Sequence, residues 1–183
     1  MKTLEDQMST YAAYHQDARN KATHFVGVPM IVFSLMIPLG WLRADVGGVS
    51  LSAAMLVSAI LLLYYLVLDL PLGLAMSALF ALMLWGAEPL SRASLGVSAG
   101  WFLTLFVVGW ALQLWGHVYE GRKPALVDNL FQIFVAPIFL AAEVFFALGY
   151  RPVLHEAVQK RALTLRAAAG AAERSVEARA AQG

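Results

Sequence analysis

The polar residues with the greatest chemical potential are gathered in residues 113–129, between two long apolar runs. Gln113, His117 and Glu120 are spaced i, i+4 and i+7, so in a helix they line one face. Gly121 follows directly and favours a left-handed cap that ends the helix. The spacing therefore predicts a helix end at which an imidazole and a carboxylate face the same way. Because polar groups at the end of a membrane helix are costly without partners, His117 and Glu120 are candidate catalytic groups.

Histidine is the commonest metal ligand in proteins, and the four histidines of this chain are candidate ligands. They are His15, His24, His117 and His155. His15 and His24 are nine residues apart, about 900° around a straight helix, so in one helix they would point in opposite directions. They can meet only if the chain breaks between them, and Asn20 is suited to cap a second helix that starts at Lys21. The alternative interpretation is that these histidines are hydrated anchors at the membrane interface.

Two glutamates are candidates for the same site. Glu120 could ligate a metal, orient a ligand or act as a general base, or it could form an interfacial ion pair with Arg122 or Lys123. Glu143 lies deep in an apolar run, where a bare charge is too costly, so it must be protonated, paired or directed into a polar cavity. We therefore expect Glu143, like Gln113, to support the ligating residues rather than to bind the metal itself.

Polar residues near the histidines could hold a substrate. Asn20 and Asn129 are suited to hydrogen-bonding a head group, and Arg19, Lys21 and Arg122 are suited to neutralising a carboxylate. Helix capping explains Asn20 equally well, and basic residues at the ends of membrane spans are common anchors. Both interpretations stay open on the sequence alone.

The composition is that of an integral membrane protein. The chain has 183 residues, of which 60% are apolar and 14% charged, and its mean hydropathy is +0.68. A soluble domain has about 45–50% apolar and about 25% charged residues. The net charge of +1 gives no reason to expect a nucleic-acid partner. The absence of cysteine excludes disulfides, thiolate metal sites and thiol catalysis. The oligomeric state cannot be derived from these features.

The apolar runs predict an all-α membrane bundle with about four transmembrane helices. These spans are residues 25–42, 51–68, 72–87 and 95–115. With a cytoplasmic N-terminus, four spans place 11 basic residues inside and 2 outside, whereas a fifth span gives 5 inside and 8 outside. We therefore expect residues 126–149 to form a broken re-entrant segment, bent near Pro137, with the histidines on the cytoplasmic face.

The C-terminal region differs in composition from the rest. Residues 152–183 are rich in alanine and arginine, with a loose apolar face that predicts an amphipathic helix on the membrane surface: Val153, Leu154, Val158, Leu163 and Leu165. The sequence thus divides into one membrane-embedded catalytic domain, residues 1–151, and a surface helix with its tail. The expected location is the bacterial inner membrane, or the endoplasmic reticulum in a eukaryote.

Three stretches of the chain have distinctive residue patterns. The first is Tyr14-His15…Asn20-Lys21…His24-Phe-Val-Gly27-Val-Pro29. The second is Gly116-His117-Val-Tyr-Glu120-Gly-Arg-Lys-Pro124-Ala125-Leu126…Asn129, and the third is Ala136-Pro137…Glu143-Val…Leu148-Gly149-Tyr150. Together these signatures resemble the family of membrane 2-hydroxy fatty acid dioxygenases (Mpo-like), formerly a domain of unknown function. The likeness spans about residues 11–151, and the first two signatures are its most specific part.

The resemblance implies an Fe(II)-dependent α-oxidation in the lipid bilayer. A 2-hydroxy fatty acid and O₂ would yield the fatty acid that is one carbon shorter, CO₂ and water. The signature histidines correspond to His15, His24 and His117, which would hold Fe²⁺ with His155 or Glu120 completing the set. The metal would chelate the hydroxyl and carboxylate of the substrate and leave a position for O₂.

Two other classes of protein remain as alternatives. A b-type haem protein also uses histidines at the ends of membrane spans, and a Soret band would distinguish it. A non-catalytic lipid-binding or transport protein would need no metal, but transport requires a polar path through the bilayer. The spans at residues 51–68 and 72–87 are almost free of polar side chains, which argues against transport.

Overall fold

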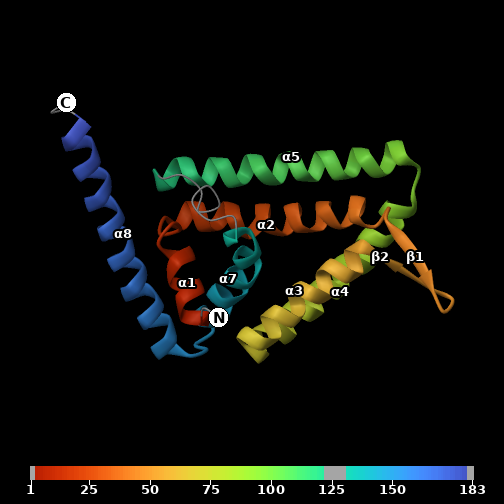
Figure 1. Ribbon diagram of the computed structural model, residues 1–183, viewed down its shortest axis with the longest axis horizontal. Helices are drawn as coiled ribbons and strands as arrows, with labels where there is room; N and C mark the ends of the chain where they lie inside the picture. Colours follow the sequence, from red (N-terminus) through yellow and green to blue (C-terminus); the bar gives the residue numbers. More distant parts are fainter. Residues whose placement is uncertain (1–2, 122–130, 181–183) are drawn as a thin grey trace.

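The computed structural model describes residues 3–121 and 131–180, with side chains up to residue 172. Within these residues the chain forms seven helices and one two-stranded antiparallel sheet (Figure 1). The elements are α1 (Leu4–Ala12), α2 (Ala18–Leu39), β1 (Arg43–Val46), β2 (Val49–Ser52), α3 (Ala53–Leu68), α4 (Leu70–Arg92), α5 (Leu95–Glu120), α7 (Gln132–Ala147) and α8 (Pro152–Ala180). The predicted helical architecture is confirmed, whereas the site predictions at Arg122 and Asn129 lie outside the described residues.

Three of the described helices, α2, α4 and α5, are long and apolar enough to cross a membrane. They correspond to three of the predicted spans, although α2 begins seven residues earlier than the predicted start at Phe25. The predicted span 51–68 is the 16-residue α3, which at about 1.5 Å per residue is shorter than the roughly 30 Å hydrocarbon core. The count of four crossings therefore stays a prediction.

Residues 136–144 of the third signature lie on α7, which is one uninterrupted helix through Pro137. The prediction of a break near Pro137 is therefore wrong for the described residues. Proline removes only one backbone hydrogen bond, and the flanking residues Val135, Ala136 and Ile138 are all buried against the rest of the bundle. Packing of this helix face offsets the lost bond, so the helix continues.

The α2 and α5 helices run antiparallel and side by side (Figure 1), and glycines set their closest approach. A Cβ atom on Gly27 would lie 2.9 Å from the carbonyl oxygen of Gly109. A Cβ atom on Gly116 would lie 2.5 Å from Oδ1 of Asn20 and closer still to Thr23. Small residues thus allow two membrane helices to pack backbone against backbone. This contact places the last turn of α5 directly against the first turns of α2.

The chain breaks between α1 and α2, as the positions of His15 and His24 required. The first helix begins with a capping box of Thr3 and Asp6 and ends at Ala12. The predicted cap at Asn20 is wrong, because Asp17 caps α2 by accepting a hydrogen bond from the backbone N–H of Arg19. Both residue types cap helices well, so local preference could not decide between them.

Two short connections join the long helices. Residues 43–52 form a β-hairpin, in which Gly47 and Gly48 both have positive φ, as a two-residue hairpin turn requires. The α4 helix continues to Arg92, so only two residues separate it from α5. Its last turn is tied to the hairpin by the ion pair of Arg43 and Glu88, 2.8 Å apart.

The C-terminal helix α8 packs on α1 (Figure 1). Val158 and Ala162 are fully buried, and Arg161 forms an ion pair with Asp6 of α1 at 2.6 Å. Val153 and Leu163 of the predicted apolar face are exposed, and the placement of this helix on the membrane surface stays a prediction. The buried face of α8 is therefore used for contact within the protein.

We expect Gly116→Ala to lower the melting temperature of the protein in detergent. Alanine normally stabilises a helix by about 0.5–1 kcal/mol relative to glycine, but here its methyl group would push α5 away from α2. Gly100, on the same helix, has open space around it, so Gly100→Ala is the matched control and should not lower the melting temperature. Equal melting temperatures for the two variants would contradict the glycine contact.

Candidate metal centre

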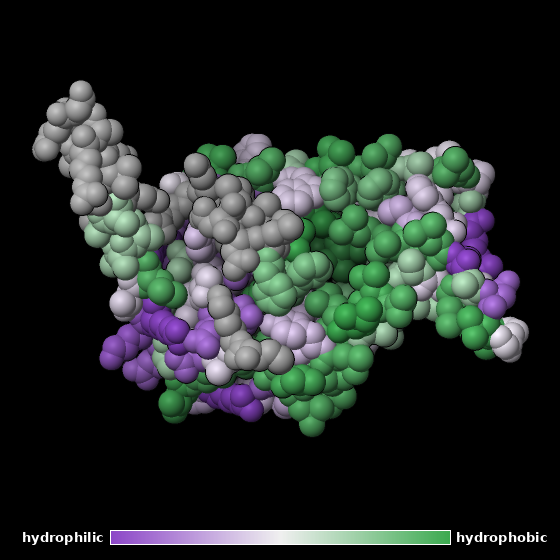
Figure 2. Space-filling model, in the orientation of Figure 1, coloured by the Kyte–Doolittle hydropathy of each residue, from purple (hydrophilic) through white to green (hydrophobic). Residues whose placement is uncertain are grey.

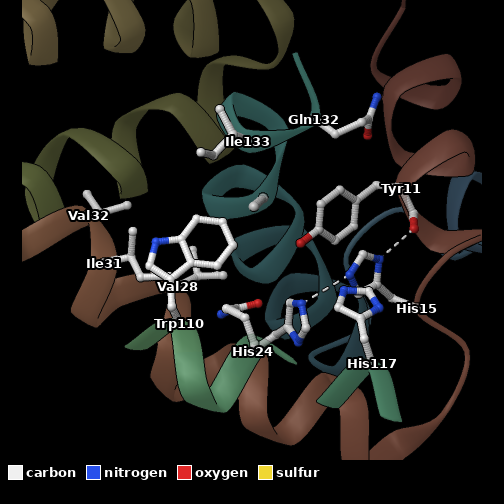
Figure 3. Close-up of a pocket in the computed structure, with 12 residues that line it drawn as sticks. Tyr11, His15, His24, Val28, Ile31, Val32, Trp110, His117, Gln132 and Ile133 are labelled. Carbon is white, nitrogen blue, oxygen red and sulfur yellow. Dashed lines mark hydrogen bonds between the residues drawn. The ribbon is translucent and has the colours of Figure 1, made fainter. Parts of the chain in front are cut away.

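Three of the four histidines converge from three different elements (Figure 3). His15 follows α1, His24 lies on the second turn of α2, and His117 lies in the last turn of α5. Their exposed fractions are 2%, 3% and 7%. One ring nitrogen from each lies within 4.8 Å of the others. The three side chains thus form a buried group with the size and the ligand type of a metal site.

Backbone carbonyls fix the orientation of two of these rings. Nδ1 of His15 lies 2.8 Å from the carbonyl oxygen of Tyr11, and Nδ1 of His24 lies 2.8 Å from the carbonyl oxygen of Asn20. Each carbonyl accepts a hydrogen bond, so each Nδ1 carries the proton. This is how metal-ligating histidines are usually oriented, with the unprotonated Nε2 left to bind the ion.

The two Nε2 atoms of His15 and His24 face each other at 3.1 Å. With both Nδ1 atoms protonated, this contact joins two lone pairs and is repulsive. A cation between them removes the repulsion, and metal–nitrogen bonds of about 2.0–2.1 Å give nitrogen–nitrogen separations near this value. Burial and the neighbouring His24 ring lower the pKa of His15 well below its usual value, which keeps it neutral and able to ligate. The residues present therefore fit a bound metal ion.

Glu120 stabilises the histidine group from outside, and it is not a member of that group. Its Oε2 accepts hydrogen bonds from the backbone N–H groups of Gln16 and Asp17, at 3.0 and 2.8 Å, and from the side chain of Asn20 at 3.1 Å. Its Oε1 forms an ion pair with Arg166 of α8. The carboxylate thus holds the turn that carries His15 against the end of α5.

The structure does not bring His155 to this group. Its ring stacks on Phe146 of α7, with centroids 4.7 Å apart. Glu143 is paired, as one of the expected alternatives required, and its partner is Lys21 at 2.7 Å. Arg19 pairs with Asp17 at 2.8 Å. Of the basic residues expected to bind a substrate carboxylate, Arg19 and Lys21 are thus engaged in ion pairs, and neither of these two lines the pocket beside the histidines.

A pocket of about 60 Å³ adjoins the three histidines. Its other lining residues are aliphatic, apart from an aromatic pair, Tyr11 and Trp110, and two amides, Gln113 and Gln132. Among the residues that the structure describes, the amide nitrogen of Gln113 and both polar atoms of Gln132 are buried without a hydrogen-bond partner. These amides are available to a bound polar molecule.

Tyr11 and Trp110 are pocket residues that the sequence did not single out. Tyr11 stacks on His15 with ring centroids 4.0 Å apart, and its hydroxyl points into the pocket (Figure 3). The sequence contains a signal for Tyr11. It precedes His15 by four residues, as Gln113 precedes His117, and this spacing places two side chains on the same face of a helix. Trp110 gave no such signal, since tryptophans at membrane interfaces are common.

Comparison with known proteins assigns the chain to a family. Residues 1–148 match the family described as 2-hydroxy-palmitic acid dioxygenase Mpo1-like. The chain is 35% identical over 153 residues to 2-hydroxy-palmitic acid dioxygenase MPO1 of Saccharomyces cerevisiae, and the match covers 82% of this chain and 84% of the yeast protein. No solved structure matches it. The match contains all three clustered histidines, and the chain belongs to the Mpo1-like family of 2-hydroxy-palmitic acid dioxygenases.

Proposed function

We propose that this protein is an Fe(II)-dependent dioxygenase that converts a 2-hydroxy fatty acid and O₂ into the fatty acid one carbon shorter, CO₂ and water. The observation that carries the proposal is the buried group of three histidines, two of which present unprotonated Nε2 atoms to each other at 3.1 Å. Family membership supports the reaction, and the apolar surroundings support a lipid substrate.

The set of ligands suits this chemistry. Three neutral imidazoles leave the full charge of a divalent ion uncompensated, which favours an anionic substrate that binds through its carboxylate and 2-hydroxyl oxygens. When bound, Fe(II) would supply open coordination positions and the electron transfer that activation of O₂ requires. The pocket of about 60 Å³ is much too small for a porphyrin, which disfavours the b-type haem alternative.

The residues around the histidines would position the head group. Burial raises the pKa of Tyr11, so its hydroxyl stays protonated at neutral pH and can donate a hydrogen bond to a substrate oxygen. The amide of Gln113, four residues before His117, and the amide of Gln132 on the opposing α7 can each bind a further polar atom. Trp110 and the aliphatic side chains exclude bulk water, which strengthens these polar contacts.

We expect His15→Ala, His24→Ala and His117→Ala each to abolish near-stoichiometric iron binding. Each removes one of three ligands, and the two that remain are too few for a stable site. His155→Ala is the matched control and should retain iron, because its ring is engaged with Phe146. Elemental analysis of anaerobically purified protein measures the difference. Iron retained in all of the first three variants would overturn the proposed site.

We expect Tyr11→Phe to lower kcat for 2-hydroxypalmitic acid by roughly 10²-fold, the lower range for loss of one positioned hydrogen-bond donor, while iron content is unchanged. The variant keeps the stacking on His15 and removes only the hydroxyl. Tyr64→Phe is the control, since the Tyr64 hydroxyl bonds Gln7 and does not line the pocket. Product analysis by mass spectrometry gives the rates, and equal rates in both variants would exclude a role for the Tyr11 hydroxyl.

We expect Glu120→Gln to weaken iron binding by about 10–100-fold, the usual effect of losing a group that orients a ligand. The neutral amide leaves Arg166 without its ion pair. It also weakens the hydrogen bonds that residue 120 accepts from the turn before α2. Glu88→Gln is the matched control. It also breaks an ion pair, that with Arg43, but in the last turn of α4 beside the β-hairpin and away from the histidines. A competition titration with an iron chelator should show weaker binding in the first variant only; equal affinities would show that Glu120 does not position the histidines.

A further inference from the structure

A second cavity lies between α2, α4 and α7, and at about 180 Å³ it is larger than the pocket beside the histidines. Every side chain that lines it is apolar, including Met76, Phe80 and Met83 of α4 and Leu140 and Ala141 of α7. A cavity with no polar group has nothing to offer water or a charged ligand. Its chemistry fits only a hydrocarbon.

The two cavities share a wall. Val28 and Val32 line both of them, and these residues lie one and two helical turns beyond His24 on α2. A ligand whose polar end lies at the histidines therefore has a direct route along α2 into the second cavity. The adjacency of the two cavities suits one molecule with a polar head and an apolar tail.

Buried side chains close the inner side of the second cavity, and partly exposed side chains surround its outer opening, which we call the rim. Met76, Phe80 and Leu140 are almost fully buried, whereas Phe25, Leu79 and Val144 are each 40–45% exposed. Figure 2 shows a recessed hydrophobic surface between the α2 and α4 helices, surrounded by further apolar surface. Because α2 and α4 are candidate membrane spans, this opening would face the acyl chains of the bilayer.

We propose that the second cavity holds the hydrocarbon tail of the substrate, which enters sideways from the bilayer between α2, α4 and α7. This assignment rests on the proposed function, and it adds where the tail lies and what limits its length. A tail that moves from lipid into an apolar cavity gains little hydrophobic free energy. The available space, more than affinity, therefore determines which chain lengths place the head group correctly.

The first test fills the cavity. Ala141→Phe places a ring among the lining residues, and Ala78→Phe makes the same change on an exposed position of α4 outside the cavity. We expect Ala141→Phe to lower kcat/KM for 2-hydroxyhexadecanoic acid at least tenfold relative to 2-hydroxyoctanoic acid, and Ala78→Phe to leave that ratio unchanged. Leu79→Trp, at the exposed rim, should shift the ratio in the same direction and replaces Ala141→Phe if that variant fails to fold. An unchanged ratio in the folded cavity variant would overturn the assignment.

The second test needs no turnover, so it separates this assignment from the proposed function. Iron-loaded wild-type protein in nanodiscs is irradiated without O₂ in the presence of 2-hydroxyhexadecanoic acid that carries a diazirine in mid-chain, and the labelled peptides are identified by mass spectrometry. We expect labels on α4 and α7 at Met76, Met83 or Ala141, and their loss in Ala141→Phe. Labels confined to the lipid-facing surface of α5, such as Val107, would overturn the tail site. Cavity labels without any turnover in the iron-loaded protein would overturn only the proposed reaction.

Discussion

The buried carboxylate of Glu120 is the interaction on which the site depends. It joins four parts of the chain: the end of α5, the turn before α2, Asn20 within α2, and Arg166 of α8. A buried carboxylate needs this many donors, because an unpaired one would be too costly to bury. In return it fixes the short turn that carries His15, so that its ring meets the rings of His24 and His117.

Charged groups are paired between neighbouring helices, while the pocket beside the histidines is lined by uncharged side chains. Lys21 with Glu143 joins α2 to α7, and Asp69 with Arg151 joins the start of α4 to the start of α8. The pocket itself presents neutral imidazoles, amides and one phenol. A neutral pocket with unprotonated nitrogens can accept a cation, and the charge of that cation can then attract an anionic ligand. The ion pairs thus join helices to one another, and the uncharged pocket is left to bind a cation and its ligand.

The features predicted correctly are those that residues close together in the sequence determine. The helix end at Gly121 is confirmed, with positive φ at that glycine, and so is the break between His15 and His24. Distant partners could not be predicted in this way. Asn20 has the chemistry of a cap, but it is buried in α2 by a bond to a residue 100 positions away. Glu143 was expected to need a partner, yet nothing in its neighbourhood pointed to Lys21, 122 positions earlier. Helix packing, which the sequence does not encode locally, decides both.

The contact of Arg166 with Glu120 has a consequence for where the functional unit ends. The family match stops at residue 148, but α8 begins at Pro152, buries Val158 and Ala162 against the bundle, and supplies the cation that neutralises Glu120. A fragment cut at residue 148 would keep the three clustered histidines and lose the counter-charge of Glu120. The residues that hold the site in place thus extend beyond the segment that matches the family, and α8, which carries no family signature, stabilises the site from outside.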